Sequence, residues 1–290
     1  MKFASTRLAA ALALTLATGA ARAHDTWFET LPAGPGSSGT ALLALGTGNQ
    51  YPVQETGIDA HYLVSRGCWA AAATSAGPPT RTQAGGAAPL ALKALRNTPT
   101  SLLLQAPKTA TTCWVQLTPF EVEVAPDKVA VYLKEIQATP AIREAWAAMQ
   151  ARGLTWRERY VKHARVELGT PSAAPAPTDL DLHLETAGQP VRVGSSFSAQ
   201  ALLNGQPLAG MALELRSETS PVGIWRRTDA QGRIEVTAPL PGRWLLRGVD
   251  LHVSATDPDR WDSRFATLAF DVAPAAAAAP SLSPSTRTPN

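Results

Sequence analysis

The stretch Phe197-Ser-Ala-Gln-Ala-Leu-Leu-Asn-Gly205 gives the clearest indication of the fold. Apolar residues stand at every second position from Phe197 to Leu203, which is typical of a strand with one face against a core. The pair Asn204-Gly205 follows directly, and this dipeptide favours a two-residue turn into a second strand. The stretch therefore predicts a β-hairpin.

The same pattern recurs through the C-terminal half of the chain. Residues 179–273 contain about seven short apolar runs separated by turn signals, a spacing typical of a small Greek-key sandwich. After Ala273 the chain consists almost entirely of alanine, proline, serine and threonine, so residues 274–290 are predicted to be a disordered tail. The clearest of these predicted strands lie at 197–203, 211–215, 234–236, 244–246 and 266–272.

The N-terminal part of the chain also consists of short apolar runs separated by turn signals. A proline- and alanine-rich segment, 169–178, carries no charge and predicts a stiff boundary between two domains. The sequence thus predicts a mainly β protein with two sandwich domains, immunoglobulin-like or transthyretin-like, at 24–168 and 179–273. The strands predicted in the first domain are Ala41–Leu45, Tyr62–Ser65, Leu90–Leu95, Ser101–Gln105, Cys113–Leu117 and Phe120–Val124.

A helical insertion is predicted between the two sandwiches, over residues 127–168. Thr139-Pro140 reads as an N-cap followed by proline at the first helical position. Thr155-Trp-Arg-Glu158 has the form of a capping box, and apolar residues four apart follow it. We therefore expect three consecutive helices, the last of them over 155–168, with its charged face towards solvent.

The first 23 residues have the features of a secretory signal. Lys2 and Arg7 precede a short apolar run, and Ala21-Arg-Ala23 is a small-x-small cleavage site. The predicted mature protein begins at His24, lies in the periplasm, and contains no later run long enough to insert in a membrane.

The amino-acid composition limits the classes of molecule that the protein can bind. The 290-residue chain is 45% hydrophobic and 17% charged, with 26 basic and 23 acidic residues. Three of the basic residues and none of the acidic ones lie in the signal, so the mature chain carries 23 of each. A neutral chain excludes binding of nucleic acid driven by composition.

The two cysteines, Cys68 and Cys113, are predicted to form a disulfide, because an even number in an exported chain favours pairing. A thiol metal or redox pair is the alternative. The chain has no G-x-S-x-G, H-E-x-x-H or P-loop motif, and we predict that it is not an enzyme.

The histidines are the informative polar residues. At a mature N-terminus, His24 offers an α-amino group and an imidazole that close one chelate ring on nickel, cobalt, copper or zinc. We expect His252 or His61 to complete such a metal site. His163 and His183 are interpreted as ordinary hydrogen-bonded or surface histidines.

Four stretches together resemble an uncharacterised periplasmic family, often described as the periplasmic component of ABC-type cobalt/nickel uptake systems. They are His24-Asp-Thr-Trp27 after the signal, Arg157-Glu-Arg-Tyr-Val-Lys-His-Ala-Arg165, Gly205–Gly210 with Thr228–Gly232, and Trp261–Leu268. The resemblance implies export, the second sandwich and an association with metal uptake. It carries His24 over as a ligand, and His252 less directly.

Two functions follow as hypotheses. The first is an exported transition-metal-binding accessory protein for nickel or cobalt uptake, which chelates the ion through His24 and passes it to a membrane importer. The alternative is a periplasmic β-sandwich module that binds proteins or carbohydrate without a metal.

Overall fold

The computed structural model describes residues 24–32, 40–70, 88–169, 171, 174–186 and 188–276, and all structural statements refer to these residues. The predicted signal 1–23 and most of the predicted tail lie outside them. The elements are β1 (Asp25–Leu31), β2 (Ala41–Gly48), β3 (Thr56–Gly57), the 3-10 helix η1 (Ala60–Tyr62), β4 (Leu63–Ala70), β5 (Lys93–Asn97), β6 (Leu102–Ala106), β7 (Ala110–Leu117), β8 (Phe120–Val124), α1 (Pro126–Glu135), α2 (Pro140–Ala151), β9 (Trp156–Glu167), β10 (Leu180–Glu185), β11 (Ser196–Leu203), β12 (Gln206–Pro207), β13 (Ala212–Ser217), β14 (Ile224–Arg227), β15 (Arg233–Thr237), β16 (Gly242–Val253) and β17 (Trp261–Val272).

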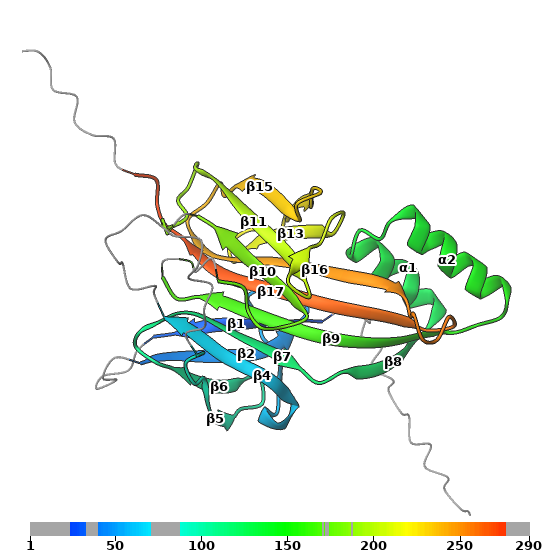
Figure 1. Cartoon of the computed structure of the whole chain (residues 1–290), viewed down its shortest axis with the longest axis horizontal. Coiled ribbons are helices and arrows are strands. Elements are labelled where there is room, and N and C mark those ends of the chain that lie inside the picture. Colours follow the sequence, from blue (N-terminus) through cyan, green and yellow to red (C-terminus); the bar gives the residue numbers. More distant parts are fainter. Residues whose placement is uncertain are drawn as a thin grey trace, which may run out of the picture.

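The predicted mainly β fold is confirmed, and its centre is an eight-stranded sheet. The strand order is β14-β13-β16-β17-β9-β7-β4, with β8 also paired to β9. A five-stranded sheet, β1-β2-β6-β5 with β3, and a four-stranded sheet, β10-β11-β12 with β15, complete the fold. Figure 1 shows the long strands β9, β16 and β17 running through the middle of the molecule, with the two smaller sheets above and below them.

The two faces of the central sheet have different coverings, because side chains alternate along each strand. From one face of β16 and β17, Trp244 and Leu268 pack against the four-stranded sheet. From the other face, Leu245 and Ala269 pack against the five-stranded sheet. Further along that second face, Leu251 packs against the helices α1 and α2. The central sheet is thus the middle layer of three.

The predicted hairpin is present at the end of β11. Asn204 and Gly205 have φ values of 51° and 74°, the left-handed values that a two-residue turn needs, and Leu203 pairs with Gln206 beyond them. The sequence prediction for this turn is confirmed.

The prediction of a third helix over 155–168 is wrong. The helices α1 and α2 form where the sequence places them, and the Thr139 side chain caps the backbone N–H of Ile142. Residues 156–167 instead form β9, which pairs antiparallel with β7 and β8 and parallel with β17. Both long edges of β9 are therefore hydrogen-bonded, and this pairing outweighs the local helical pattern.

The predicted linker does not separate two independent sheets. The parallel pairing of β9 with β17 joins strands from both sides of residues 169–178 in one sheet. Each side has its own main core, however: one consists mostly of residues 27–166 and the other of residues 180–272. The predicted domain bounds enclose two cores that share the central sheet.

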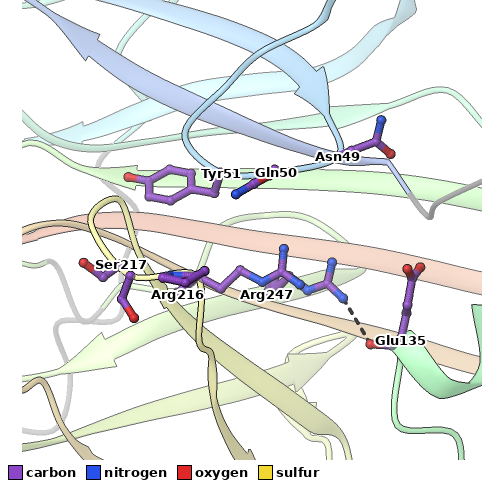
Figure 2. A pocket seen from close by; sticks show the side chains of 9 residues that line it. Asn49, Gln50, Tyr51, Glu135, Arg216, Ser217 and Arg247 are labelled. Atoms are coloured by element: carbon purple, nitrogen blue, oxygen red, sulfur yellow. Dashed lines mark hydrogen bonds between the residues drawn. The ribbon is translucent and has the colours of Figure 1, made fainter.

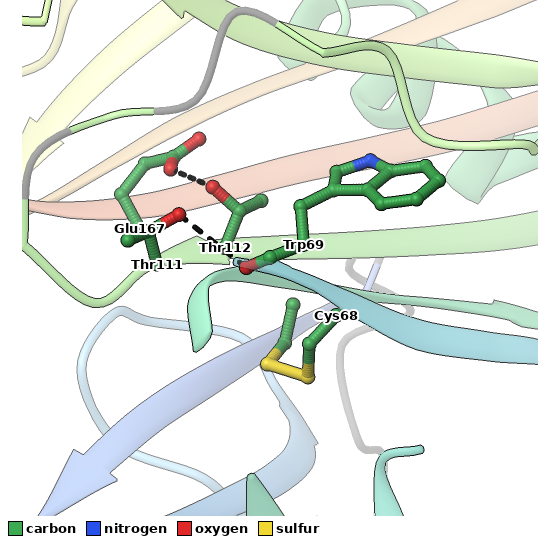
Figure 3. Close-up of a disulfide and its surroundings, with 6 residues drawn as sticks. Cys68, Trp69, Thr111, Thr112 and Glu167 are labelled. Atoms are coloured by element: carbon green, nitrogen blue, oxygen red, sulfur yellow. Dashed lines mark hydrogen bonds between the residues drawn. A yellow bond between two sulfur atoms is a disulfide. The ribbon is translucent and has the colours of Figure 1, made fainter. Parts of the chain in front are cut away.

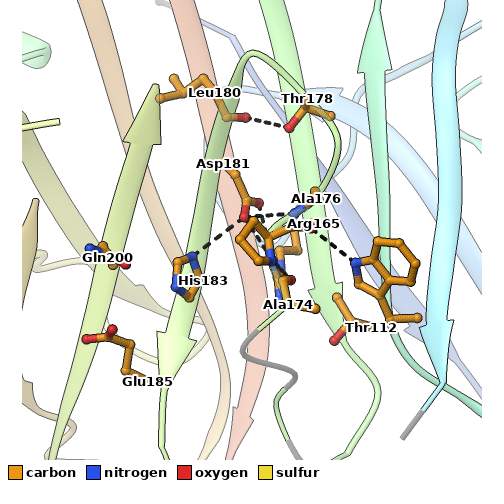
Figure 4. Close-up of polar contacts among 12 residues, drawn as sticks. Thr112, Arg165, Ala174, Ala176, Thr178, Leu180, Asp181, His183, Glu185 and Gln200 are labelled. Atoms are coloured by element: carbon orange, nitrogen blue, oxygen red, sulfur yellow. Dashed lines mark hydrogen bonds and ion pairs between the residues drawn. The ribbon is translucent and has the colours of Figure 1, made fainter. Parts of the chain in front are cut away.

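The described part of the linker is held against the sheet by hydrogen bonds. Trp69 Nε1 donates to the Pro175 carbonyl at 3.2 Å, and buried Arg165 donates to the Ala174 carbonyl at 3.2 Å. Arg165 also pairs with Asp181 at 3.0 Å, and the Ala176 amide donates to the same carboxylate at 3.0 Å. Figure 4 shows this group of contacts between β9 and β10.

The disulfide between Cys68 and Cys113 is present, as predicted, and joins β4 to β7 across one register pair (Figure 3). The two cysteines are separated by 45 positions in the sequence, and the disulfide closes the loop between them. In the chain-entropy model, a loop of this length gives about 4 kcal/mol of stabilisation.

Replacing both cysteines with alanine is therefore expected to lower the free energy of unfolding by up to about 4 kcal/mol. The native protein should show no reactive thiol when denatured without a reductant. Urea unfolding of the two forms, with thiol labelling, measures both quantities. Two labelled thiols in the native protein would contradict the pairing.

Candidate functional site at the start of β1

The N-terminal strand β1 enters the fold at the junction of the five-stranded sheet, the helices and the central sheet. His24 is exposed immediately before it, while the next four residues are buried. Asp25 pairs in register with Gly48 of β2, so the turn after β2 lies beside His24. The backbone of β1 is also held by the central sheet, because Thr267 Oγ1 of β17 donates to the Thr26 carbonyl at 2.6 Å.

A buried ion cluster holds Asp25. Its carboxylate pairs with Arg247 of β16, and Arg247 Nε lies 3.0 Å from Glu214 Oε2 of β13. Arg247 also donates from Nη2 to the Glu135 carbonyl at 3.2 Å, at the end of α1. The three charged side chains are each 5–7% exposed. The burial of these charges is compensated by their mutual pairing, which fixes the first residue of β1 to three other elements.

Lys162 holds the backbone of His24 itself. Its Nζ donates to the His24 carbonyl oxygen at 2.9 Å. Burial lowers the pKa of Lys162 to about 8, against the opposing charge of Asp25. The hydrogen bond uses the carbonyl oxygen of His24 and involves neither its backbone nitrogen nor its imidazole.

His252 does not lie with His24. Arg247, which contacts Asp25, and His252 are both on β16 but differ by an odd number of positions, so they point to opposite faces of the central sheet. His252 Nδ1 lies 3.6 Å from Asp250, which in turn pairs with Arg264 on β17. The structure therefore places the His252 side chain on the other face of the central sheet from the Asp25–Arg247 contact.

His61 lies on the same side of the sheet as His24 but at the far end of a row of aromatic rings. Its ring contacts Tyr62 in a tilted arrangement, Tyr62 contacts Phe120, and Phe120 contacts Tyr160. Only Tyr160 lies near the start of β1, because the Nζ of Lys162 is 5.7 Å from the centre of its ring. The nearest acid to His61 is Asp59, at 2.9 Å. The structure therefore does not bring His61 to His24 either.

Within the described ranges, no group of three histidine, cysteine or acidic side chains is arranged to hold a metal ion. His163 of β9 and His183 of β10 are both buried. His163 contacts Asp179 and the Phe265 carbonyl, and His183 lies 3.6 Å from Asp181. In the described part of the chain, no helix has the length and apolar character to cross a membrane.

A polar cavity of about 230 Å³ lies next to the Asp25–Arg247 pair. Figure 2 shows the guanidinium groups of Arg216 and Arg247 along one wall, with Tyr51 and Gln50 of the turn after β2 opposite them. The sequence interpretation did not find this cavity. One signal was available: Arg247 is a charged residue within the apolar run of a strand that is predicted to face a core.

A second buried carboxylate, Glu158 of β9, connects the helices to the sheet. It accepts hydrogen bonds from Trp156 Nε1 at 2.7 Å, from Tyr132 Oη at 3.0 Å and from the Ser263 hydroxyl. Burial raises the pKa of Glu158 above its ordinary value, although the three donors oppose the shift.

The raised pKa predicts a pH dependence of stability. The native state binds the Glu158 proton more tightly than the unfolded chain does, so this contribution is complete below about pH 4.5 and is lost as pH rises through the raised pKa. We expect Glu158→Gln to gain stability relative to the native protein as pH rises from 4 to 8. Urea unfolding of both proteins across this range measures the difference, and a difference independent of pH would contradict the assignment.

The comparisons with known proteins identify the family but not an activity. Neither the search of curated proteins nor the search of solved structures gave a significant match. A family model described as "Domain of unknown function (DUF4198)" matches residues 21–249. This range begins at the predicted cleavage site, includes β1 and Arg247, and covers most of the chain, so the protein belongs to the DUF4198 family.

Proposed function

We propose that this chain is an exported protein that binds a transition-metal ion, nickel or cobalt, through His24 as its mature N-terminal residue. The observation that carries the proposal is the fixed start of β1. His24 is exposed, while the residue directly after it is held by a buried ion pair.

The chemistry needs two nitrogens in one place. Cleavage after Ala23 would give His24 a free α-amino group beside its imidazole, and both groups suit nickel, cobalt, copper and zinc. The hydrogen bond from Lys162 and the ion pair of Asp25 orient the backbone of this residue without using either nitrogen. A backbone fixed in advance lowers the ordering cost of binding.

The proposed role is delivery rather than storage. Two protein nitrogens leave several coordination positions of the ion to water or to another molecule, which favours exchange. We therefore propose a membrane metal importer as the acceptor of the ion, with the chain acting as an accessory protein in the periplasm.

Calorimetric titration with nickel and cobalt tests the proposal. The protein should be released from a fusion so that His24 is its first residue, and it is expected to bind one ion per chain. His24→Ala, released in the same way, is expected to lose binding, because one of the two nitrogens is gone. His61→Ala and His252→Ala are matched controls that should bind as the native protein does.

Binding should also weaken as the pH falls, because a protonated nitrogen cannot coordinate a metal. If His24→Ala binds nickel and cobalt as tightly as the native protein, the metal proposal is wrong. The interaction module without a metal then takes its place.

A further inference from the structure

The strand β16 of the central sheet extends further than its neighbour β13. The pairing with β13 covers only residues 244–248, whereas β16 continues to Val253 (Figure 1). On its other side, β16 is paired with β17 along its whole length. Among the described residues, no strand pairs with the β13 side of residues 249–253, which we call the free edge of β16.

The free edge has backbone groups that are available for pairing. In an antiparallel sheet, successive residues direct their N–H and C=O groups alternately to the two neighbouring strands. At least two of residues 249–253 therefore direct both groups away from β17. In the part of the chain that the structure describes, no group outside the sheet is hydrogen-bonded to them. An extended peptide has the matching donors and acceptors.

A cavity of about 250 Å³ lies along the free edge. Its lining comes from the turn between α1 and α2, the turn between β12 and β13, Arg227 of β14 and residues 249–251 of β16. The volume is larger than the roughly 150 Å³ of a cavity that holds benzene, so apolar side chains of a peptide fit within it. Most of the lining is itself apolar and includes Ile136, Ile142, Leu208, Met211, Val249 and Leu251.

Arg227 gives the cavity a positive charge at the end where β13 begins. It lies on β14, opposite Ala212, the first residue of β13. Its guanidinium donates to the Gly210 carbonyl and, at 3.1 Å, to the Gln137 carbonyl, so it is held between the two turns. No acidic side chain of the described ranges pairs with it. Its remaining N–H groups can donate to a ligand.

The other charged residue of the lining is compensated. Asp250 lies 3.3 Å from Arg264 of β17, so Arg227 carries the uncompensated charge of the cavity. A peptide that pairs antiparallel with the free edge runs in the direction of β13 and ends where β13 begins. Its C-terminal carboxylate then meets Arg227, and a guanidinium and a carboxylate form a charge-assisted pair.

We propose that the free edge of β16 binds the C-terminal end of an extended, apolar peptide, antiparallel to β16, with the terminal carboxylate at Arg227. The backbone groups of the edge bind the peptide as an added strand. The apolar lining and Arg227 select apolar side chains and a free carboxylate. The proposal does not depend on a metal at His24.

Calorimetry on the metal-free protein with two matched peptides tests the proposal. The first peptide is N-acetyl-Ser-Thr-Leu-Thr-Val with a free carboxylate, and the second is the same peptide with a C-terminal amide. We expect the free acid to bind at least about tenfold more tightly, since the amide removes one charge-assisted contact. Equal binding of the two peptides, or binding of neither, would overturn the proposal.

Variants of Arg227 test the carboxylate contact. Arg227→Gln should lower the affinity for the free acid to that for the amide and leave the amide unaffected, whereas Arg227→Lys keeps the charge and should retain the preference. Arg226→Gln, at the neighbouring exposed position of β14, is the matched control and should change neither affinity. The thermal midpoint of each variant shows whether it is folded. An equal loss for both peptides in folded Arg227→Gln, or no loss, would overturn the proposal.

Amide hydrogen exchange in the native protein locates the bound peptide without a variant. A saturating concentration of the free acid should slow exchange at least about tenfold at alternate residues of 249–253, because their N–H groups become hydrogen-bonded. Residues 93–97 form β5, an edge strand of the five-stranded sheet, and their exchange should not change. Unchanged exchange at 249–253, or equal slowing at β5, would place the peptide elsewhere and overturn the proposal.

Discussion

Replacing Arg247 with leucine is expected to lower the free energy of unfolding by about 3–5 kcal/mol, the scale seen when one partner of a buried ion pair is removed. The carboxylates of Asp25 and Glu214 both lose a partner in this variant, and each is at most 7% exposed. Leucine fills part of the volume but leaves Asp25 buried and charged. For a chain of this size, a change of this magnitude corresponds to a fall of about 10 °C in the thermal midpoint.

Urea unfolding of the native protein, Arg247→Leu and the control Arg226→Leu measures this effect. Adding Asp25→Asn to Arg247→Leu should recover part of the lost stability, because it removes one of the unpaired charges. A loss of less than about 1 kcal/mol, in the range of exposed ion pairs, would show that the cluster does not fix the start of β1.

The alternating strands and their turns could be predicted from the sequence, because their signals are local. The hairpin at Asn204-Gly205 and the cap at Thr139 depend on a few neighbouring residues, and both are present. The disulfide was predictable as well, because only two cysteines were available to form it.

The strand β9 could not be recognised, because its helical and extended patterns coincide. Trp156, Tyr160 and Ala164 are four apart, so they share one side of a helix and also one face of a strand. The decisive contacts come from β17, about a hundred residues later, and parallel pairing leaves no local mark on the sequence.

The start of β1 was missed as a strand for a similar reason. Asp25 is a charged residue that becomes buried only because Arg247, 222 positions away, pairs with it. The relative position of His24 and His252 in the predicted metal site could not be predicted for the same reason. The alternation along β16 indicates that His252 lies opposite Leu251, as the sequence suggested. Only the contact between Arg247 and Asp25 shows which face of β16 meets β1.

A large loss of nickel affinity is expected when the N-terminus is extended beyond His24. A protein that begins at Ala21 keeps every side chain of the mature form but moves the α-amino group three residues away from His24. The six-membered chelate ring that the metal forms with the α-amino nitrogen, Cα, Cβ, Cγ and Nδ1 of one residue is then lost, and the remaining imidazole binds alone. Because the proposed site has one other protein ligand, the α-amino nitrogen, we expect the nickel affinity to fall by at least about 100-fold, or 2.8 kcal/mol on the scale of about 1.4 kcal/mol per tenfold.

Side-by-side nickel titration of the forms that begin at His24 and at Ala21 is the most direct test of the proposed function. Both forms should show the same thermal midpoint without metal, since Lys162 and Arg247 contact residues that both contain. Our account predicts one tightly bound ion for the form that begins at His24 and at least about 100-fold weaker binding for the form that begins at Ala21. Equal affinity of the two forms would contradict it, because the α-amino group would then have no part in binding the metal.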